Sequence, residues 1–88
     1  MNVFYTTQFK RDYKRVRKQG KDIRVLEEVI RALCRGEKLA PRHKDHRLSG
    51  RWNRHRECHV RSDWLLIYRL KGDSLYFERT GSHSELFE

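Results

Sequence analysis

Histidine and glutamate alternate along one stretch of the carboxyl half of the chain. His55, Glu57 and His59 are each two residues apart, so in an extended strand their side chains share one face. Arg56, Cys58 and Val60 then occupy the opposite face. Imidazole exchanges protons near neutral pH because its ordinary pKa is about 6.5. The alternation therefore predicts a strand face that is equipped for acid–base chemistry.

Three further ionisable residues follow in positions that an antiparallel sheet would bring to the same end. Asp63 lies in a predicted turn, Arg79 ends a later predicted strand, and His83 lies in the tail beyond it. With the strand histidines, these groups suit phosphodiester cleavage without a metal. One group takes the proton of a ribose 2′-hydroxyl, a cation stabilises the phosphorane, and another group protonates the leaving 5′-oxygen. Arginine suits the cationic role because it stays charged and offers a planar fork to phosphate.

Other interpretations of the same residues remain open. A histidine in a strand of a basic protein is often a surface residue or a hydrogen-bonded structural one, and this holds for His59 and His83 taken singly. Arg79 could pair with Glu78 or Glu57 rather than with phosphate. Composition alone does not decide between these roles.

A metal site is a competing interpretation of His55-x-x-Cys58-His59. In a strand, residues that are adjacent or three apart point to opposite faces, so these side chains cannot complete a tetrahedron around zinc. The chain also has no glycine-rich phosphate loop, Cys-x-x-Cys pair or nucleophile elbow. We therefore expect no metal and no cofactor.

The carboxyl half is expected to form the sheet that positions these residues. Trp64-Leu65-Leu66-Ile67-Tyr68 is a short apolar run, which favours a strand covered on both faces over a helix. Strands are predicted at about 52–60, 64–70 and 74–80. The two short turns that join them require antiparallel pairing.

The amino half is expected to supply one strand and two helices. A strand at residues 3–5 is followed by a helix cap at Thr6-Thr7 and an amphipathic helix over about 8–20, and Asp22 caps a second helix that ends near Gly36. Residues 39–51 are too polar for core and predict a loop, pinned back on the domain at Leu48, Gly50 and Trp52. The tail over 82–87 suits one helical turn. The sequence thus predicts a single α+β domain over 1–88, with an amino-terminal strand and a helical hairpin packed on an antiparallel sheet.

Composition points to a polyanionic partner. The 88 residues carry 21 Lys and Arg against 12 Asp and Glu, a net charge of +9, and the sequence pI is about 10.1. Such a balance favours nucleic acid, or otherwise an acidic protein. No apolar run approaches the roughly 20 residues that span a bilayer, and Cys34 and Cys58 show no paired spacing. We expect a cytoplasmic protein with reduced thiols and no membrane partner.

Three ordered motifs resemble a known family. They are Lys44-Asp45-His46-x-Leu48-x-Gly50-x-Trp52, His59-Val60-x-x-Asp63-Trp64-Leu65-Leu66-Ile67-Tyr68 and Phe77-Glu78-Arg79-Thr80-Gly81-Ser82-His83-x-x-Leu86-Phe87. On these motifs the sequence is similar to the YafQ branch of the RelE superfamily, the messenger-RNA-cleaving toxins of bacterial toxin–antitoxin pairs. The resemblance covers nearly the whole chain. It implies a small ribonuclease, related in shape to microbial RNases, that enters the ribosomal A site, cuts mRNA and is neutralised by a cognate antitoxin. Contact with operator DNA would occur only through the antitoxin complex.

The resemblance also assigns roles to residues. It implies an acid–base group made of His46, His59, Asp63 and His83, with Arg79 as the phosphate-binding cation. Trp64 and Phe87 are expected to shape the site or to stack on a base, although Trp64 also opens the buried run. His43 and His55 match no catalytic position of the family and are expected to face the substrate or to be incidental.

Surplus cations are expected to hold RNA outside the scissile bond. Lys44 and Arg47 in the loop, together with Arg42, are expected to contact RNA, and so is a row on the first helix: Lys10, Arg11, Lys14, Arg15, Arg17 and Lys18. The alternative function is a catalytically weak member of the same family that binds RNA, or that binds operator DNA through its antitoxin complex.

Overall fold

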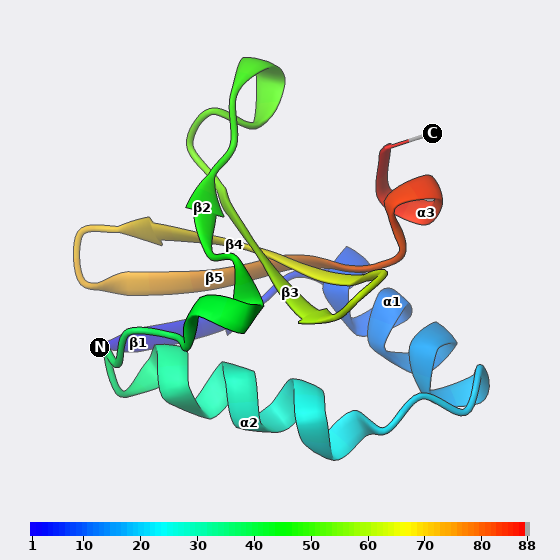
Figure 1. Cartoon of the computed structure of the whole chain (residues 1–88). Coiled ribbons are helices and arrows are strands. Elements are labelled where there is room, and N and C mark those ends of the chain that lie inside the picture. The colour runs from blue at the N-terminus through cyan, green and yellow to red at the C-terminus, as the bar shows by residue number, and fades with distance from the viewer. Residues whose placement is uncertain (88) are drawn as a thin grey trace.

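The computed structural model describes residues 1–87 (Figure 1). Its elements in chain order are β1 (Asn2–Tyr5), α1 (Thr7–Lys18), α2 (Ile23–Cys34), the 3-10 turn η1 (Pro41–His43), β2 (His46–Arg47), the 3-10 turn η2 (Gly50–Trp52), β3 (Arg56–Arg61), β4 (Trp64–Lys71), β5 (Ser74–Gly81) and α3 (His83–Phe87). The predicted α+β class is confirmed. Within residues 1–87, no helix combines the length and the apolar character that crossing a membrane would require.

The five strands form one sheet in the order β1-β5-β4-β3-β2. Strands β3, β4 and β5 make the predicted antiparallel meander, while β1 lies at the edge and pairs parallel to β5. Parallel pairing is possible because α1 and α2 form a long crossover between β1 and the rest of the sheet. The sheet is therefore mixed rather than wholly antiparallel.

Both predicted helices begin at their predicted caps. The Thr6 hydroxyl accepts a hydrogen bond from the backbone N–H of Phe9 at 3.0 Å, and Asp22 Oδ1 accepts one from Arg24 at 3.1 Å. The apolar stripe of each helix packs on the same face of the sheet, as Figure 1 shows for α2 below β3. This face holds the main core: Phe9, Val16, Leu26, Val29, Ile30, Leu33, Cys58, Val60, Trp64, Leu66, Tyr68, Leu75 and Phe77.

The segment before β3 differs from its predicted structure. The predicted strand over 52–60 begins only at Arg56, because residues 50–52 turn as η2 and Gly50 takes a φ of +66°. The predicted loop contains a two-residue strand, β2, whose His46 pairs with Glu57 of β3. This pairing brings the loop back across the sheet and places His46 beside the strand histidines.

The second face of the sheet is only partly covered. Leu65 and Ile67 of β4 pack there with Leu86 of α3, and Leu48 and Trp52 pack against them from the loop, which confirms that these two residues pin it. This small cluster lies between α3 and the β2 segment, which rise from the same side of the sheet in Figure 1. The uncovered remainder, called the open face below, carries the ionisable residues.

A side chain at Gly81, where β5 passes into α3, would displace the ends of Arg15 and Glu85 from their hydrogen bonds to the Thr80 carbonyl and the Ser82 N–H. The φ of Gly81 is +156°, and a β-carbon there would lie 2.5 Å from Arg15 Nη2 and 2.9 Å from Glu85 Oε1. We expect Gly81→Ala to lower the free energy of unfolding by about 2 kcal/mol, through backbone strain and displaced neighbours. Urea denaturation measures the loss. Gly36→Ala is the matched control because Gly36 has a φ of +72° but open space around it. An equal loss in the two variants would contradict the steric part of this prediction.

Candidate active site

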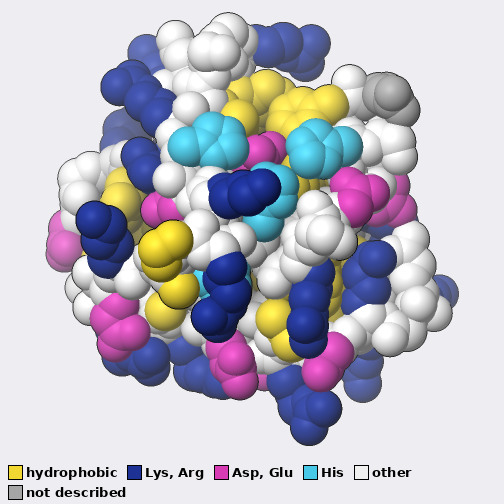
Figure 2. Space-filling model, in the orientation of Figure 1, with side chains coloured by type: hydrophobic (Ala, Val, Ile, Leu, Met, Phe, Trp, Pro, Cys, Tyr) yellow, Lys and Arg dark blue, Asp and Glu magenta, His cyan; other side chains and the backbone are white. Residues whose placement is uncertain are grey.

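The open face gathers the ionisable side chains of β2, β3 and the α3 end of the sheet. Figure 2 shows several histidine side chains grouped on one face, with hydrophobic side chains beside them and Lys and Arg side chains around them. The ring centroids of His59 and His83 are 6.0 Å apart. The structure therefore brings together residues that lie on separate elements of the chain.

A buried carboxylate lies between two of the histidines. Glu57 is only 5% exposed, and its Oε2 is 3.4 Å from His46 Nε2 and 3.8 Å from His59 Nε2. His46 Nδ1 is 2.7 Å from the carbonyl oxygen of Lys44. Because a carbonyl can only accept, Nδ1 of His46 donates, and Nε2 is the atom that faces Glu57. Glu57 thus lies close to both rings and can form an ion pair with either ring when that ring is protonated.

His83 is held by Asp63 through both its backbone and its ring. Asp63 Oδ1 accepts a hydrogen bond from the backbone N–H of His83 and lies 3.2 Å from His83 Nδ1. A carboxylate only accepts, so Nδ1 of His83 donates and Nε2 is left for other partners. The hydrogen bonds from the backbone and ring of His83 lower the pKa of Asp63 from its ordinary value. Asp63 is therefore a carboxylate anion, and it orients the His83 ring.

Arg79 pairs with Asp12, which lies 67 residues before it in the chain. Its Nε donates to Asp12 Oδ2 at 2.7 Å and its Nη2 donates to Asp12 Oδ1 at 3.2 Å. Asp12, in α1, is fully buried and also accepts from Arg15 Nη1 and from the backbone N–H of Thr80. The Arg79 side chain remains 22% exposed. Pairing with Glu78 or Glu57 is therefore wrong for this structure.

Replacing Asp12 by Asn should destabilise the fold in a pH-dependent way. Burial raises the pKa of Asp12, but hydrogen bonds from Arg79, Thr80 and Gln8 outweigh it and the pKa is lowered. The folded state then binds fewer protons than the unfolded chain, so the stabilisation is present at neutral pH and is lost as the pH falls below about 4. We expect a loss of about 3 kcal/mol at neutral pH, because two guanidinium groups lose their shared partner.

Urea denaturation of the Asp12→Asn protein at pH 7 and at about pH 3 tests this expectation. The difference from the unmodified protein should shrink in acid. Asp22→Asn is the control because its side chain is exposed and asparagine caps helices as well as aspartate does. A loss at pH 7 no larger than that of the control would contradict the role of Asp12.

The aromatic residues divide between the rim of the site and the core. Phe87 is 42% exposed, and its ring centroid is 6.2 Å from those of His83 and Trp52, so it is placed to contact a base. Trp64 is only 3% exposed and lies in the main core, where its Nε1 donates to Thr80 Oγ1 at 2.9 Å. The expectation that Trp64 stacks on a base is wrong, because the helices cover its ring. Its hydrogen bond to Thr80, the residue after Arg79, fixes this part of β5.

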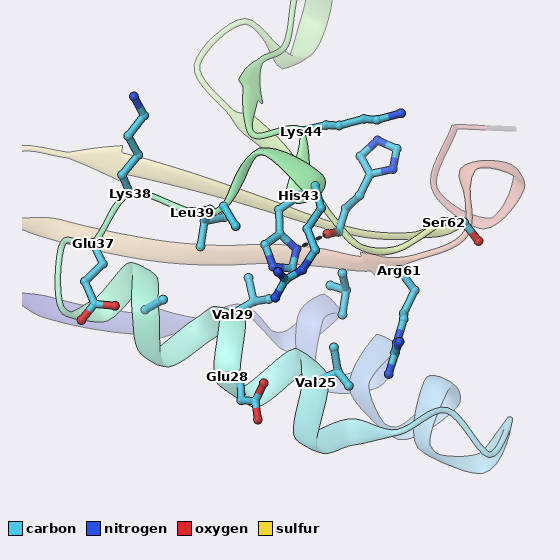
Figure 3. Close-up of a pocket in the computed structure, with 15 residues that line it drawn as sticks. Val25, Glu28, Val29, Glu37, Lys38, Leu39, His43, Lys44, Arg61 and Ser62 are labelled. Carbon is cyan, nitrogen blue, oxygen red and sulfur yellow. Dashed lines mark hydrogen bonds between the residues drawn. The ribbon is translucent and has the colours of Figure 1, made fainter.

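His43 is a structural residue rather than a substrate-facing one. It is 8% exposed, and its Nδ1 lies 2.6 Å from the carbonyl oxygen of His59, to which it therefore donates. Figure 3 shows this bond at the edge of a pocket of about 700 Å³ between α2 and the η1 segment, with Lys44 extending away from the pocket floor. His43 thus fixes the backbone of His59.

The loop cations and His55 flank the site. Lys44 and Arg47 are exposed, as expected for contacts with RNA, and Lys44 takes a positive φ of +46°. His55 Nε2 is 3.6 Å from Glu78 Oε1, and its ring contacts that of Trp52 with centroids 5.0 Å apart. His55 therefore lies beside the catalytic candidates and not among them.

Of the five predicted catalytic residues, His46, His59, Asp63 and His83 lie together on the open face. Arg79 is bound on the α1 side, and no hydrogen bond or ion pair joins it to the histidines within residues 1–87. Glu57 was missing from the predicted site, although its alternation with His55 and His59 indicated the shared face. Two histidines that each lie beside a carboxylate can give and take protons on opposite sides of a phosphate.

Comparison with known proteins gives one consistent result. A sequence model of the family described as "Bacterial toxin of type II toxin-antitoxin system, YafQ" matches residues 1–88. The chain is 39% identical over 87 residues to the mRNA interferase toxin YafQ of Escherichia coli strain K12, covering 98% of this chain and 95% of that protein. It is also 32% identical over 92 residues to the putative toxin YafQ of Haemophilus influenzae, covering 97% of this chain and 90% of that protein.

Solved structures agree with the sequence comparison. The crystal structure of YafQ from E. coli BL21(DE3) superposes with a TM-score of 0.96 at 38% identity, covering 99% of this chain and 98% of that one. The E. coli DinJ–YafQ complex gives 0.93 at 39% identity, with 99% and 98% covered. A copper-bound L66S mutant toxin from Helicobacter pylori gives 0.93 at 41% identity, with 99% of both chains covered.

Proposed function

The chain belongs to the YafQ family of bacterial toxins of type II toxin–antitoxin systems, and we propose that it cleaves mRNA on the ribosome with the histidines and carboxylates of its open face. Relatives that are 39% identical carry the name mRNA interferase toxin, which makes the chain an endoribonuclease of this kind. The observation that carries the site assignment is the approach of His59 and His83, each beside its own carboxylate.

The reaction on this proposal is attack by the ribose 2′-hydroxyl on the adjacent phosphorus. One of the two rings, His59 or His83, accepts the hydroxyl proton, and the other protonates the leaving 5′-oxygen. Glu57 and Asp63 stabilise the charged form of the ring that each contacts, and His46 shares Glu57 with His59. Phe87 stacks on a base next to the scissile bond.

Arg79 stabilises the negative charge of the phosphorane. A guanidinium offers five N–H donors, and Asp12 accepts from only two of its nitrogens, Nε and Nη2. Nη1 therefore stays available to a phosphate oxygen, and the side chain is partly exposed. Asp12 holds the guanidinium in place, so its orientation is set before RNA binds.

Docking on the ribosome uses the outer surface of α1. Lys10, Arg11, Lys14, Arg17 and Lys18 are exposed there and outnumber what one scissile phosphate needs. Arg15 must be removed from the predicted row, because its guanidinium contacts Asp12, the Thr80 carbonyl and Glu85. The remaining cations bind ribosomal RNA by charge, in the cytoplasm where ribosomes translate.

A cognate antitoxin is the second partner on this proposal. The E. coli relative has been solved as a DinJ–YafQ complex, and the net charge of +9 favours a partner with an acidic segment. Such a segment would neutralise the toxin by covering cationic surface or by closing the open face.

The test is cleavage of a defined mRNA by the protein freed of its antitoxin. We expect cuts within the reading frame when the mRNA is being translated, and fewer cuts when the ribosomal A site is kept occupied. Added antitoxin should stop the cleavage. Binding to ribosomes without any cleavage would favour the alternative, a member of the family that binds RNA but does not cut it.

A further inference from the structure

A second pocket opens on the sheet at the end far from α3. It has a volume of about 370 Å³ and lies between β2, the segment that follows η2, the start of β3 and the end of β4. Its polar lining is formed by Asn53 and six basic side chains, Arg47, Arg54, His55, Arg56, Arg69 and Lys71. We call this the cationic pocket. No carboxylate lines it, and Leu70 is its one aliphatic lining residue.

The nearest carboxylates neutralise only part of this charge. Asp45 lies 3.3 Å from Arg56 Nε, and Glu78 lies 3.7 Å from Arg69 Nε and 3.6 Å from His55. Arg54 and Lys71 are exposed and make no hydrogen bond or ion pair with any side chain in residues 1–87. Two carboxylates thus face five permanent cations, and the pocket is left with positive charge for an external anion.

The cationic pocket lies on the same strands as the catalytic candidates. His55 precedes Glu57 by two residues, and Arg69 follows Leu65 and Ile67 of β4 at the same alternation. Arg56 and Arg47, in contrast, are adjacent to Glu57 and His46 and point to the opposite face. Leu65 pairs with His59, and Arg69 lies four residues farther along β4, which is about 13 Å at 3.3 Å per residue. A nucleic acid strand with one phosphate between His59 and His83 would therefore cross to this pocket within a few nucleotides.

We propose that the cationic pocket binds the phosphodiester backbone of the substrate RNA strand, a few nucleotides from the bond that is cut. This inference rests on the proposed function, because it follows the same strand away from the histidines. Four arginines favour phosphate, since the planar guanidinium matches its oxygens with paired N–H donors. A protein segment would need apolar contact to dock, and the pocket offers little beyond Leu70.

The test compares a double variant, Arg54→Gln with Lys71→Gln, with a charge-matched control, Arg31→Gln with Lys38→Gln, whose side chains are exposed and belong neither to the cationic pocket nor to the docking surface of α1. The probe is a 2′-O-methyl RNA of about ten nucleotides, which cannot be cut because its 2′-oxygen is blocked. Affinity is measured over a range of salt concentrations without ribosomes. Each phosphate contact with a single strand contributes about 0.7 to the slope of log K against log salt. The pocket variant should lose about 1.4 of that slope, and the control should keep it.

Several outcomes would overturn the inference. If the slope of log K against log salt were unchanged in the pocket variant, Arg54 and Lys71 would not contact the RNA. An equal loss in both double variants would indicate charge attraction without a site. A variant that binds RNA normally but loses affinity for the antitoxin would assign the pocket to the protein partner.

Two controls separate this inference from the proposed function. The difference in salt slope between the pocket variant and the control should vanish when the probe is a dinucleotide, which is too short to reach from the histidines to the pocket. If the unmodified protein cleaves translated mRNA while the slopes do not differ, the pocket assignment fails and the proposed function stands. If it cleaves no mRNA, the proposed function fails whatever the slopes are.

Discussion

Replacing His83 by Ala is expected to slow mRNA cleavage by about 10²- to 10⁴-fold while ribosome binding is retained. The ring of His83 is exposed, is oriented by Asp63 and lies 6.0 Å from that of His59, so its loss removes a proton-transfer group from the site. Its removal leaves the core intact, because His83 packs in neither apolar cluster. Single-turnover cleavage on ribosomes measures the rate, and co-sedimentation measures binding.

Matched variants make the His83 prediction specific. Ser84→Ala changes the neighbouring residue of the same helix and should cut at nearly the unmodified rate. The double variant of His59 and His83 should lose far less than the product of the two single losses, because the rings act in one reaction. Cleavage by the His83→Ala protein at the unmodified rate would remove this residue from the mechanism.

Arg79→Ala is expected to be at least as damaging, with a loss on the order of 10³-fold in cleavage rate. The charge of Arg79 acts most strongly when the phosphorane forms, so substrate binding should change much less than the rate. Arg79→Lys keeps the charge but loses the planar fork and should recover only part of the activity. The unfolding midpoint must be measured beside the rate, because Arg79 also pairs with buried Asp12.

Asp12→Asn separates the two roles of Arg79. This variant keeps the guanidinium but loses the carboxylate that orients it, so below its unfolding midpoint it should lose less of the cleavage rate than Arg79→Ala does. Arg79→Ala should lose that rate even at temperatures where it is fully folded. Equal losses in the two variants would mean that Arg79 acts only by holding α1 against β5.

Local patterns were sufficient to predict most of the elements. The helix starts at Thr6 and Asp22 follow from cap chemistry, and the meander follows from short turns between apolar runs. The short strand β2 was missed because two polar residues carry no periodic signal. Its pairing with β3 depends on the return of the whole loop, which is a tertiary event.

The errors in the predicted site have the same origin. The burial of Asp12 depends on Arg79, which lies 67 residues away in sequence, so helical periodicity gives no signal for it. His43 matches no catalytic position of the family and was expected to face the substrate or to be incidental, yet its bond to the His59 carbonyl holds it inside. Trp64 lies at the start of the buried run, and the structure assigns it to the core. Polar residues at these positions are satisfied by partners that are distant in sequence.

The most direct measurement of the proposed mechanism is the chemistry of the ends left on mRNA cut on the ribosome. Acid–base catalysis of 2′-hydroxyl attack predicts a 2′,3′-cyclic phosphate or 3′-phosphate on the upstream fragment and a 5′-hydroxyl on the downstream one. A 3′-hydroxyl upstream and a 5′-phosphate downstream would mean that activated water attacked instead, and would contradict the assignment of the open face.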